Sequence, residues 1–182
     1  MSLRKILTRG DPALTKTCRP VEKFDQKLHW LLDDLKETLE NAGGVGLAAP
    51  QIGILRRVVV VEDEDEQMIE LVNPVIVDQS GEQEGWEGCL SVPNQYGWVS
   101  RPNFVTVRAQ NRDGDFFEVS GEELVARCFC HELEHLDGHL FVEHTGELYT
   151  PDEIDAMEGS EGEREQPESR PRKQAGRRDK KR

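Results

Sequence analysis

The chain has 182 residues and a net charge of −13, and 36% of its residues are hydrophobic. This length is enough for one domain with a substantial core, which the clustering of Val, Ile and Leu places within residues 1–150. No apolar segment reaches the roughly 18 residues that a membrane span needs, and the N-terminus lacks the apolar core of a signal peptide, so we exclude a membrane-spanning protein and expect a cytoplasmic one.

The first predicted element is an amphipathic helix over residues 25–41. Four leucines recur there at helical spacing, with acids and lysines between them: Leu28, Leu32, Leu35 and Leu39. Gly43 and Gly44 follow and end the helix. Two apolar segments farther along, residues 56–63 and 68–78, predict β-strands.

The next predicted element is a β-hairpin over residues 104–121, with its turn at Asp113 and Gly114. A second helix should follow the hairpin directly. This order, with strands first and a late helix that carries a polar motif, favours an α+β fold.

The second helix is predicted from its capping signals. Ser120 and Glu123 have the spacing of a capping box, and the segment behind them contains no Gly or Pro. We therefore expect a helix over about residues 121–136, closed by Gly138.

Residues 151–182 have a different composition. Residues 152–168 carry eight acidic side chains, whereas residues 169–182 carry eight Lys or Arg and one Asp, a local charge of +7. Almost no apolar residue follows Met157. This pattern predicts a disordered tail, separate from the domain of residues 1–150. The tail is either solvated without a dedicated partner, or its basic end contacts the ribosome or RNA through phosphate groups.

The polar motif of the second helix is His-Glu-x-x-His, with His131, Glu132 and His135. At about 100° per residue, both histidines fall on one stripe with Leu124 and Cys128, the face that a helix normally buries. The spacing lets both imidazoles bind one ion, with the glutamate beside them. The alternative is a pair of core histidines that are held by hydrogen bonds.

Two histidines do not hold an ion alone, so a third ligand is needed. Cys128 shares the stripe, but seven helical residues place it about 10 Å from His135 along the axis, too far to share one ion. Phe141 stands where a metzincin motif needs its third histidine. Glu143 and Glu147 remain as candidates, although they follow closely behind the helix end.

Upstream, Cys89 is a stronger candidate. Gly85 and Gly88 flank it, so its backbone is able to approach another element closely. A set of His, His and Cys leaves a fourth position open for water, which is typical of catalytic sites. The alternative is a buried free cysteine.

Three segments together carry a resemblance to a known family: GVGLAAPQ (44–51), EGCLS (87–91) and HELEH (131–135). In this order and at these spacings they resemble the signature motifs of the peptide deformylase family, and the resemblance covers about residues 1–148. It implies an α+β fold of mostly antiparallel β-sheets packed around a central metal-binding helix, with an N-terminal amphipathic helix.

The resemblance implies that Cys89, His131 and His135 bind one metal ion, with water in the fourth position. Ferrous iron is the expected ion, and zinc, nickel or cobalt are expected substitutes. The implied reaction removes the formyl group from the N-terminal methionine of newly made proteins and releases formate. The expected partners are therefore N-formylmethionyl nascent peptides.

The resemblance also implies roles for groups around the ion. Glu132 should take the proton of the water and deliver it to the leaving amine. The Gln51 side-chain amide and the Leu90 backbone N–H should donate to the formyl oxygen as it gains negative charge. The peptide should add as a strand, with its methionine in an apolar pocket. The expected substrate-binding residues are Gly44, Val45, Gly46, Gly88, Leu124 and Cys128.

Some positions depart from the family's pattern. Arg127 lies close to the expected methionine pocket, and Cys130 and Glu134 stand where the family often has Gln and Asp. None is an expected ligand or base, so they affect only the predicted pocket shape. Glu87 and Arg101 either pair as a brace for the Cys89 segment or are two solvated charges.

Two other functions compete with deformylation. A zinc endopeptidase of the His-Glu-x-x-His class explains residues 131–135 but leaves Gln51 and Cys89 without a role. A non-catalytic, ribosome-associated metal-binding protein needs neither Glu132 nor Gln51. Both alternatives are therefore less favoured.

Overall fold

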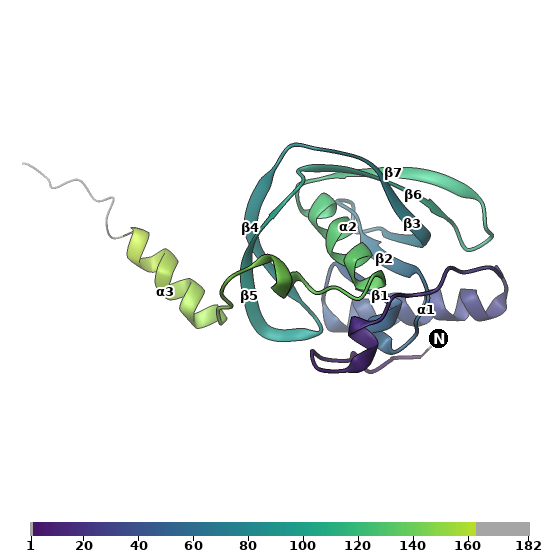
Figure 1. The fold of residues 1–182 in the computed structure, drawn as a ribbon, viewed down its shortest axis with the longest axis horizontal. Coiled ribbons are helices and arrows are strands. Elements are labelled where there is room, and N and C mark those ends of the chain that lie inside the picture. The colour runs from purple at the N-terminus through teal and green to yellow at the C-terminus, as the bar shows by residue number, and fades with distance from the viewer. Residues whose placement is uncertain (1, 163–182) are drawn as a thin grey trace, which may run out of the picture. The chain divides into compact units, whose positions relative to one another are not determined.

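The computed structural model of the chain describes residues 2–162 and divides into two compact units, the first ending at Thr150 (Figure 1). The helices and strands of the first unit are, in chain order, α1 (Gln26–Ala42), β1 (Gly46–Ala48), β2 (Val58–Glu62), β3 (Met68–Ser80), β4 (Gln83–Cys89), β5 (Val92–Arg101), β6 (Phe104–Gln110), β7 (Phe116–Glu122) and α2 (Glu123–Leu136). Three short 3₁₀ helices join them: Pro12–Thr15, Ala49–Ile52 and Phe141–His144.

All paired strands are antiparallel. β1, β2, β3, β6 and β7 form one sheet in that order, and β4 and β5 form a second. The predicted hairpin forms as β6 and β7. α2 contacts strands of both sheets, and Figure 1 shows it inside the curve that the strands make. The predicted α+β fold with mostly antiparallel sheets is confirmed.

Four consecutive valines in β2 divide the core. Neighbouring side chains of a strand point to opposite faces, so a continuous apolar run has to be buried on both faces. Val59 and Val61 pack in one cluster with Phe129 of α2, whereas Val58 and Val60 pack in another with the leucines of α1. β2 therefore lies between the two helices and fixes both against the sheet.

α1 occupies the segment that leucine spacing predicts to be helical. The Asp25 carboxylate accepts hydrogen bonds from backbone N–H groups of the first turn, at 3.1 and 3.2 Å. At the other end, Gly43 adopts a left-handed conformation with φ 66° and donates to the Leu39 carbonyl. The four predicted leucines are buried.

α2 begins at Glu123 rather than near Gly121, and the predicted capping box is not formed. Ser120 lies in β7, where its hydroxyl pairs with the Thr106 hydroxyl at 2.8 Å. The prediction failed because cross-strand pairing uses the residues that were expected to cap the helix. Leu124, in the first helical turn, is 59% exposed instead of buried with the rest of its stripe.

The second unit begins with α3 (Pro151–Gly162), which corrects the prediction that all of residues 151–182 are disordered. Proline at the first position and the acids Asp152 and Glu153 in the first turn favour a helix N-terminus. The rest of the predicted tail, including its basic end, lies outside the described residues. No described helix is both long and apolar enough to cross a membrane.

Candidate metal centre and substrate cleft

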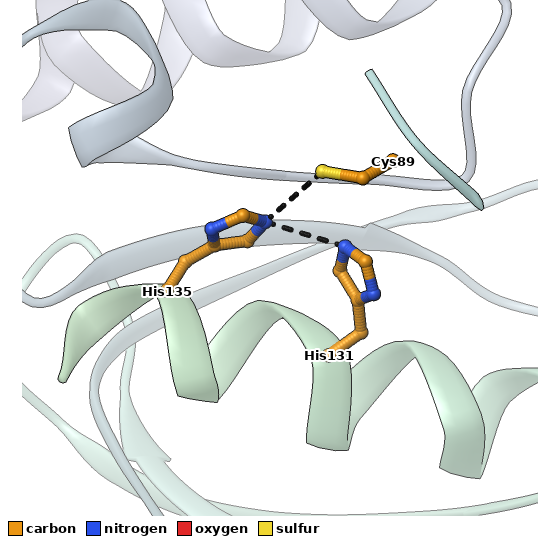
Figure 2. A group of neighbouring side chains, drawn as sticks. All are labelled: Cys89, His131 and His135. Atoms are coloured by element: carbon orange, nitrogen blue, oxygen red, sulfur yellow. Dashed lines mark hydrogen bonds between the residues drawn. The ribbon is translucent and has the colours of Figure 1, made fainter. Parts of the chain in front are cut away.

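Three side chains from distant parts of the sequence converge on one point (Figure 2). His131 and His135 stand one turn apart on α2, and Cys89 is the last residue of β4. His135 Nε2 lies 3.3 Å from Cys89 Sγ and 3.2 Å from His131 Nε2. All three donor atoms lie within 4.8 Å of one another. Two imidazole nitrogens and a thiol so placed fit the donor set of one divalent transition-metal ion.

The other candidate ligands have different neighbours. The Cys128 thiol donates to a backbone carbonyl at 3.5 Å. Glu143 pairs with His139 at 2.9 Å, and Glu147 accepts a hydrogen bond from the Tyr149 hydroxyl. Within residues 2–162, none of these side chains joins the three-residue group.

The buried Glu87 carboxylate contacts the His131 ring nitrogen that faces away from the other two donors. Glu87 Oε1 lies 3.2 Å from His131 Nδ1, which accounts for a hydrogen on Nδ1 and leaves Nε2 with its lone pair. Glu87 Oε2 accepts from Arg101 at 3.1 and 3.3 Å, and Arg101 also binds Glu134 at 2.7 and 3.1 Å. Glu87 and Arg101 are each 5% exposed, so the interpretation as two solvated charges is wrong.

The neighbours of Glu87 stabilise its ionised form. Burial alone raises the pKa of this carboxyl, but the hydrogen bond from His131 and the charge of Arg101 outweigh burial and hold the pKa below its usual range. A charged Glu87 in turn keeps the His131 ring in one orientation.

Replacing Arg101 with alanine is expected to lower the free energy of unfolding by about 3 kcal/mol, because the buried Glu87 carboxylate loses its nearest cation and, among the described residues, keeps only Arg127, at 3.9 Å, as a charged partner. The change should also weaken metal binding about 10–100-fold through His131. Denaturant unfolding and metal titration measure the two effects. Arg108→Ala is the control, since that side chain is exposed and lies over the Phe116 ring, away from Glu87. An Arg101→Ala protein as stable as this control would contradict the assignment.

Glu132 lies beside the ligands and is 4% exposed. Burial raises the pKa of its carboxyl to about 7. Its Oε2 atom is buried and has no hydrogen-bond partner among the described residues. A Cβ at Gly46 would lie 2.6 Å from Glu132 Oε1 and 2.6 Å from Cys128 Sγ. Glycine is therefore needed there for β1 to approach α2.

Gln51 brings an amide to the same point. The side chain is 1% exposed, and its Oε1 accepts from the Ala48 backbone N–H at 2.8 Å. Its Nε2 lies 3.1 Å from Ser91 Oγ and 3.6 Å from Cys89 Sγ. Leu90 lies between Cys89 and Ser91 in the sequence. A Cβ at Gly44 would come within 2.9 Å of the Leu90 side chain.

A cavity of about 380 Å³ opens beside this group. His131, Glu132 and Leu90 line it, as do all the predicted substrate-binding residues: Gly44, Val45, Gly46, Gly88, Leu124 and Cys128. The exposure of Leu124 follows from its place on the cavity wall. A larger cavity of about 550 Å³ lies against α1, but none of these residues lines it. The larger cavity is therefore not the one that the predicted residues line.

Comparison with known proteins decides the family. The model of the polypeptide deformylase family matches residues 3–150. The chain belongs to the peptide deformylase family. It is 54% identical to the peptide deformylase of Agathobacter rectalis over 143 residues, which cover 79% of this chain and 90% of that protein. It is 49% identical to peptide deformylase 1 of Bacillus subtilis over 160 residues, which cover 87% of this chain and all of that protein.

Solved structures of the family agree with this placement. The peptide deformylase of Legionella pneumophila is 40% identical with a TM-score of 0.76, and the match covers 91% of this chain and all of that one. The enzyme from Thermotoga maritima is 35% identical with a TM-score of 0.77, over 81% of this chain and all of that one. The family resemblance that the motifs predicted is confirmed, and the chain is an enzyme of this family.

Three residues near the site of this deformylase-family chain were not predicted from the sequence. Trp86 and Tyr96 line the cavity from β4 and β5, and Ser91 contacts Gln51. Ser91 belongs to the EGCLS motif, which was the one available signal, whereas the two aromatic residues carry none. Arg127, which was expected near the pocket, does line the cavity, and it donates to the Val99 carbonyl at 3.0 Å.

Proposed function

We propose that this chain is a metal-dependent hydrolase that removes the formyl group from the N-terminal formylmethionine of newly made proteins and releases formate. One observation carries the proposal: Cys89, His131 and His135 converge beside the Glu132 carboxylate and the Gln51 amide. A site that only binds metal needs neither of the last two groups. Membership in the peptide deformylase family supports the same activity.

Cys89, His131 and His135 are the proposed ligands of one divalent ion. The pairing of His131 Nδ1 with Glu87 supports this role, because it directs the Nε2 lone pair toward the other two donors. We propose ferrous iron as the ion, with zinc, nickel or cobalt as substitutes that the same soft and imidazole donors accept. When bound, such an ion would act as a Lewis acid that lowers the pKa of water, so that the deprotonated nucleophile is available near neutral pH.

Glu132 is the proposed general base and general acid. Its Oε2 atom has no partner among the described residues, so it is available to accept the proton of the attacking water. The same oxygen then returns the proton to the amine nitrogen as the carbon–nitrogen bond breaks. The products are formate and a peptide with a free N-terminal amine.

Gln51 and Leu90 are the proposed donors to the formyl oxygen. This oxygen gains negative charge when the formyl carbon becomes tetrahedral, and fixed donors lower the barrier most at that point. The Gln51 amide is held by Ala48 and Ser91, so it needs little reorganisation. The Leu90 backbone N–H is the second proposed donor.

The peptide is proposed to lie along residues 44–46 and Gly88 as an added strand. β1 is at the edge of its sheet, and such an edge offers backbone groups for pairing. This pairing does not depend on the side chains of the added peptide. The methionine side chain then occupies the cavity beside Val45, Leu124 and Cys128. This arrangement suits an enzyme that accepts many different sequences after the first residue.

The test compares three substrates with one preparation of iron-loaded protein. We expect formate from a formylmethionyl peptide, little product from the matching acetylmethionyl peptide, and no cleavage of an unmodified internal peptide. Formate by enzymatic assay and peptides by mass spectrometry give the three readouts. Cleavage of the internal peptide without formate release would favour the endopeptidase alternative and contradict the proposal.

We also propose a cytoplasmic enzyme whose basic end, residues 169–182, contacts the ribosome or RNA. Deleting residues 155–182 is expected to leave turnover of short peptides within about twofold of the full chain while weakening ribosome binding, which sedimentation with purified ribosomes measures. Deletion of residues 169–182 alone should give the same loss of binding. A large loss of activity on short peptides, or ribosome binding that survives both deletions, would count against this role.

A further inference from the structure

The Gln51 side chain is held in one amide orientation by its buried neighbours. The backbone N–H of Ala48 is only a donor, so the atom that faces it at 2.8 Å has to be the amide oxygen. The NH₂ group therefore faces the opposite way, toward Ser91 Oγ at 3.1 Å and Cys89 Sγ at 3.6 Å. Its two hydrogens diverge by about 120° in the amide plane, so fixing one direction fixes the other.

Ser91 is built into the site as the acceptor of one of these hydrogens. The residue is fully buried, and its backbone N–H points to Cys89 Sγ at 3.4 Å. Its hydroxyl oxygen lies closer to Gln51 Nε2 than the sulfur does. When the hydroxyl accepts one hydrogen, the second is directed toward Cys89, which lines the cavity.

The N-terminal segment fixes the distance between these two residues. The Leu7 N–H donates to the Gln51 carbonyl at 2.7 Å, and the Arg9 N–H donates to the Ser91 carbonyl at 2.7 Å. Two backbone bonds from residues two apart thus join the Gln51 segment to the turn after β4. The side-chain contact between Gln51 and Ser91 therefore lies between two backbone segments that the N-terminal segment holds at a fixed distance from each other.

We propose that Ser91 is a positioning residue, which aims the Gln51 amide at the formyl oxygen of the substrate. This inference rests on the proposed deformylase function, because it gives Gln51 the task of donating to that oxygen. Ser91 itself does not touch the substrate. Without its hydroxyl, Gln51 keeps the bond from Ala48 but loses the acceptor that directs its NH₂ group.

The first test is the kinetics of Ser91→Ala in the iron-loaded full chain with a formylmethionyl peptide. We expect kcat to fall about 10–100-fold while KM stays within about twofold, since the lost interaction acts only in the transition state. Ser91→Thr retains the hydroxyl and is expected to recover most of kcat. Ser100→Ala removes an exposed serine hydroxyl of β5 and is the control that should match the wild type. An unchanged kcat in Ser91→Ala, or a folded Thr variant as slow as Ala, would overturn the proposal.

A double-mutant cycle distinguishes positioning from a general structural role. In a Gln51→Ala background, Ser91→Ala is expected to lower kcat by less than about twofold, because its effect is transmitted through Gln51. An equal loss in both backgrounds would show that the serine acts independently and would overturn the inference.

A spectroscopic test is independent of activity. In ¹⁵N-labelled, zinc-loaded protein, the Gln51 side-chain amide is assigned by its absence from Gln51→Ala. We expect its hydrogens to exchange with solvent faster in Ser91→Ala than in the wild type, and equal exchange rates would contradict the contact. If the wild type releases no formate, the proposed function fails, whereas normal release with unchanged Ser91→Ala kinetics defeats this inference alone.

Discussion

Replacing Glu132 with glutamine is expected to lower kcat for formate release about 10²–10⁴-fold, the range that a positioned acid–base group contributes. Glutamine keeps the shape of the side chain but does not accept the proton of the attacking water. Because Glu132 is not one of the three proposed ligands, metal content should remain at one ion per chain. Steady-state formate assays at saturating peptide and metal analysis of the same sample measure both quantities.

The control for Glu132 is another glutamate of the same helix. Glu123 is exposed in the first turn of α2, so Glu123→Gln should release formate at the wild-type rate. Equal rates for Glu132→Gln and wild type would refute the assignment of the base. Loss of metal from Glu132→Gln would show instead that this residue supports the ligand set.

Replacing Cys89 with alanine is expected to reduce affinity for the metal at least about 100-fold, since loss of even an outer-sphere partner of a ligand costs about 10–100-fold. Formate release should fall in parallel, because the two remaining imidazoles do not fix an ion in the cleft. Titration of apo protein with zinc under reducing conditions gives the affinity. The fold should survive, because Cys89 lies at the end of β4, outside the two main clusters of the core.

Cys18 provides the matched control for Cys89. It is a buried free cysteine, 3% exposed, that contributes no atom to the three-residue group. Burial raises the pKa of its thiol to about 11, so it stays protonated and uncharged at neutral pH. Cys18→Ala should bind one ion with wild-type affinity. Full metal affinity in Cys89→Ala would instead require a different third ligand.

The parts of the fold that the sequence predicted well are those with local signals. Leucine spacing and the terminating Gly43 predicted α1 from signals in and next to its own segment. The valine run of β2 predicted a strand, although not that a helix lies on each of its faces. The position of Cys128 excluded it as a ligand from helix geometry alone, and its separate contact with a backbone carbonyl is consistent with that exclusion.

The parts that were missed depend on contacts between distant segments. Ser120 has the residue type and spacing of a helix cap, but its hydroxyl is hydrogen-bonded to the Thr106 hydroxyl across the hairpin and does not cap α2. Glu87 and Arg101 are charged residues whose burial follows from the packing of β4 and β5 over α2, which composition does not reveal. The acidic composition after Thr150 concealed α3, whose first turn is stabilised by those same acids.

The central claim is that Cys89, His131 and His135 hold an ion on which the release of formate depends. The most direct measurement follows formate from one formylmethionyl peptide through three states of one anaerobic preparation: loaded with ferrous iron, stripped by a chelator, and reloaded. We expect one formate for each new peptide amine in the loaded state, at least about a 100-fold loss after stripping, and recovery on reloading. Absence of formate from the loaded protein, or undiminished release after complete stripping, would contradict the claim.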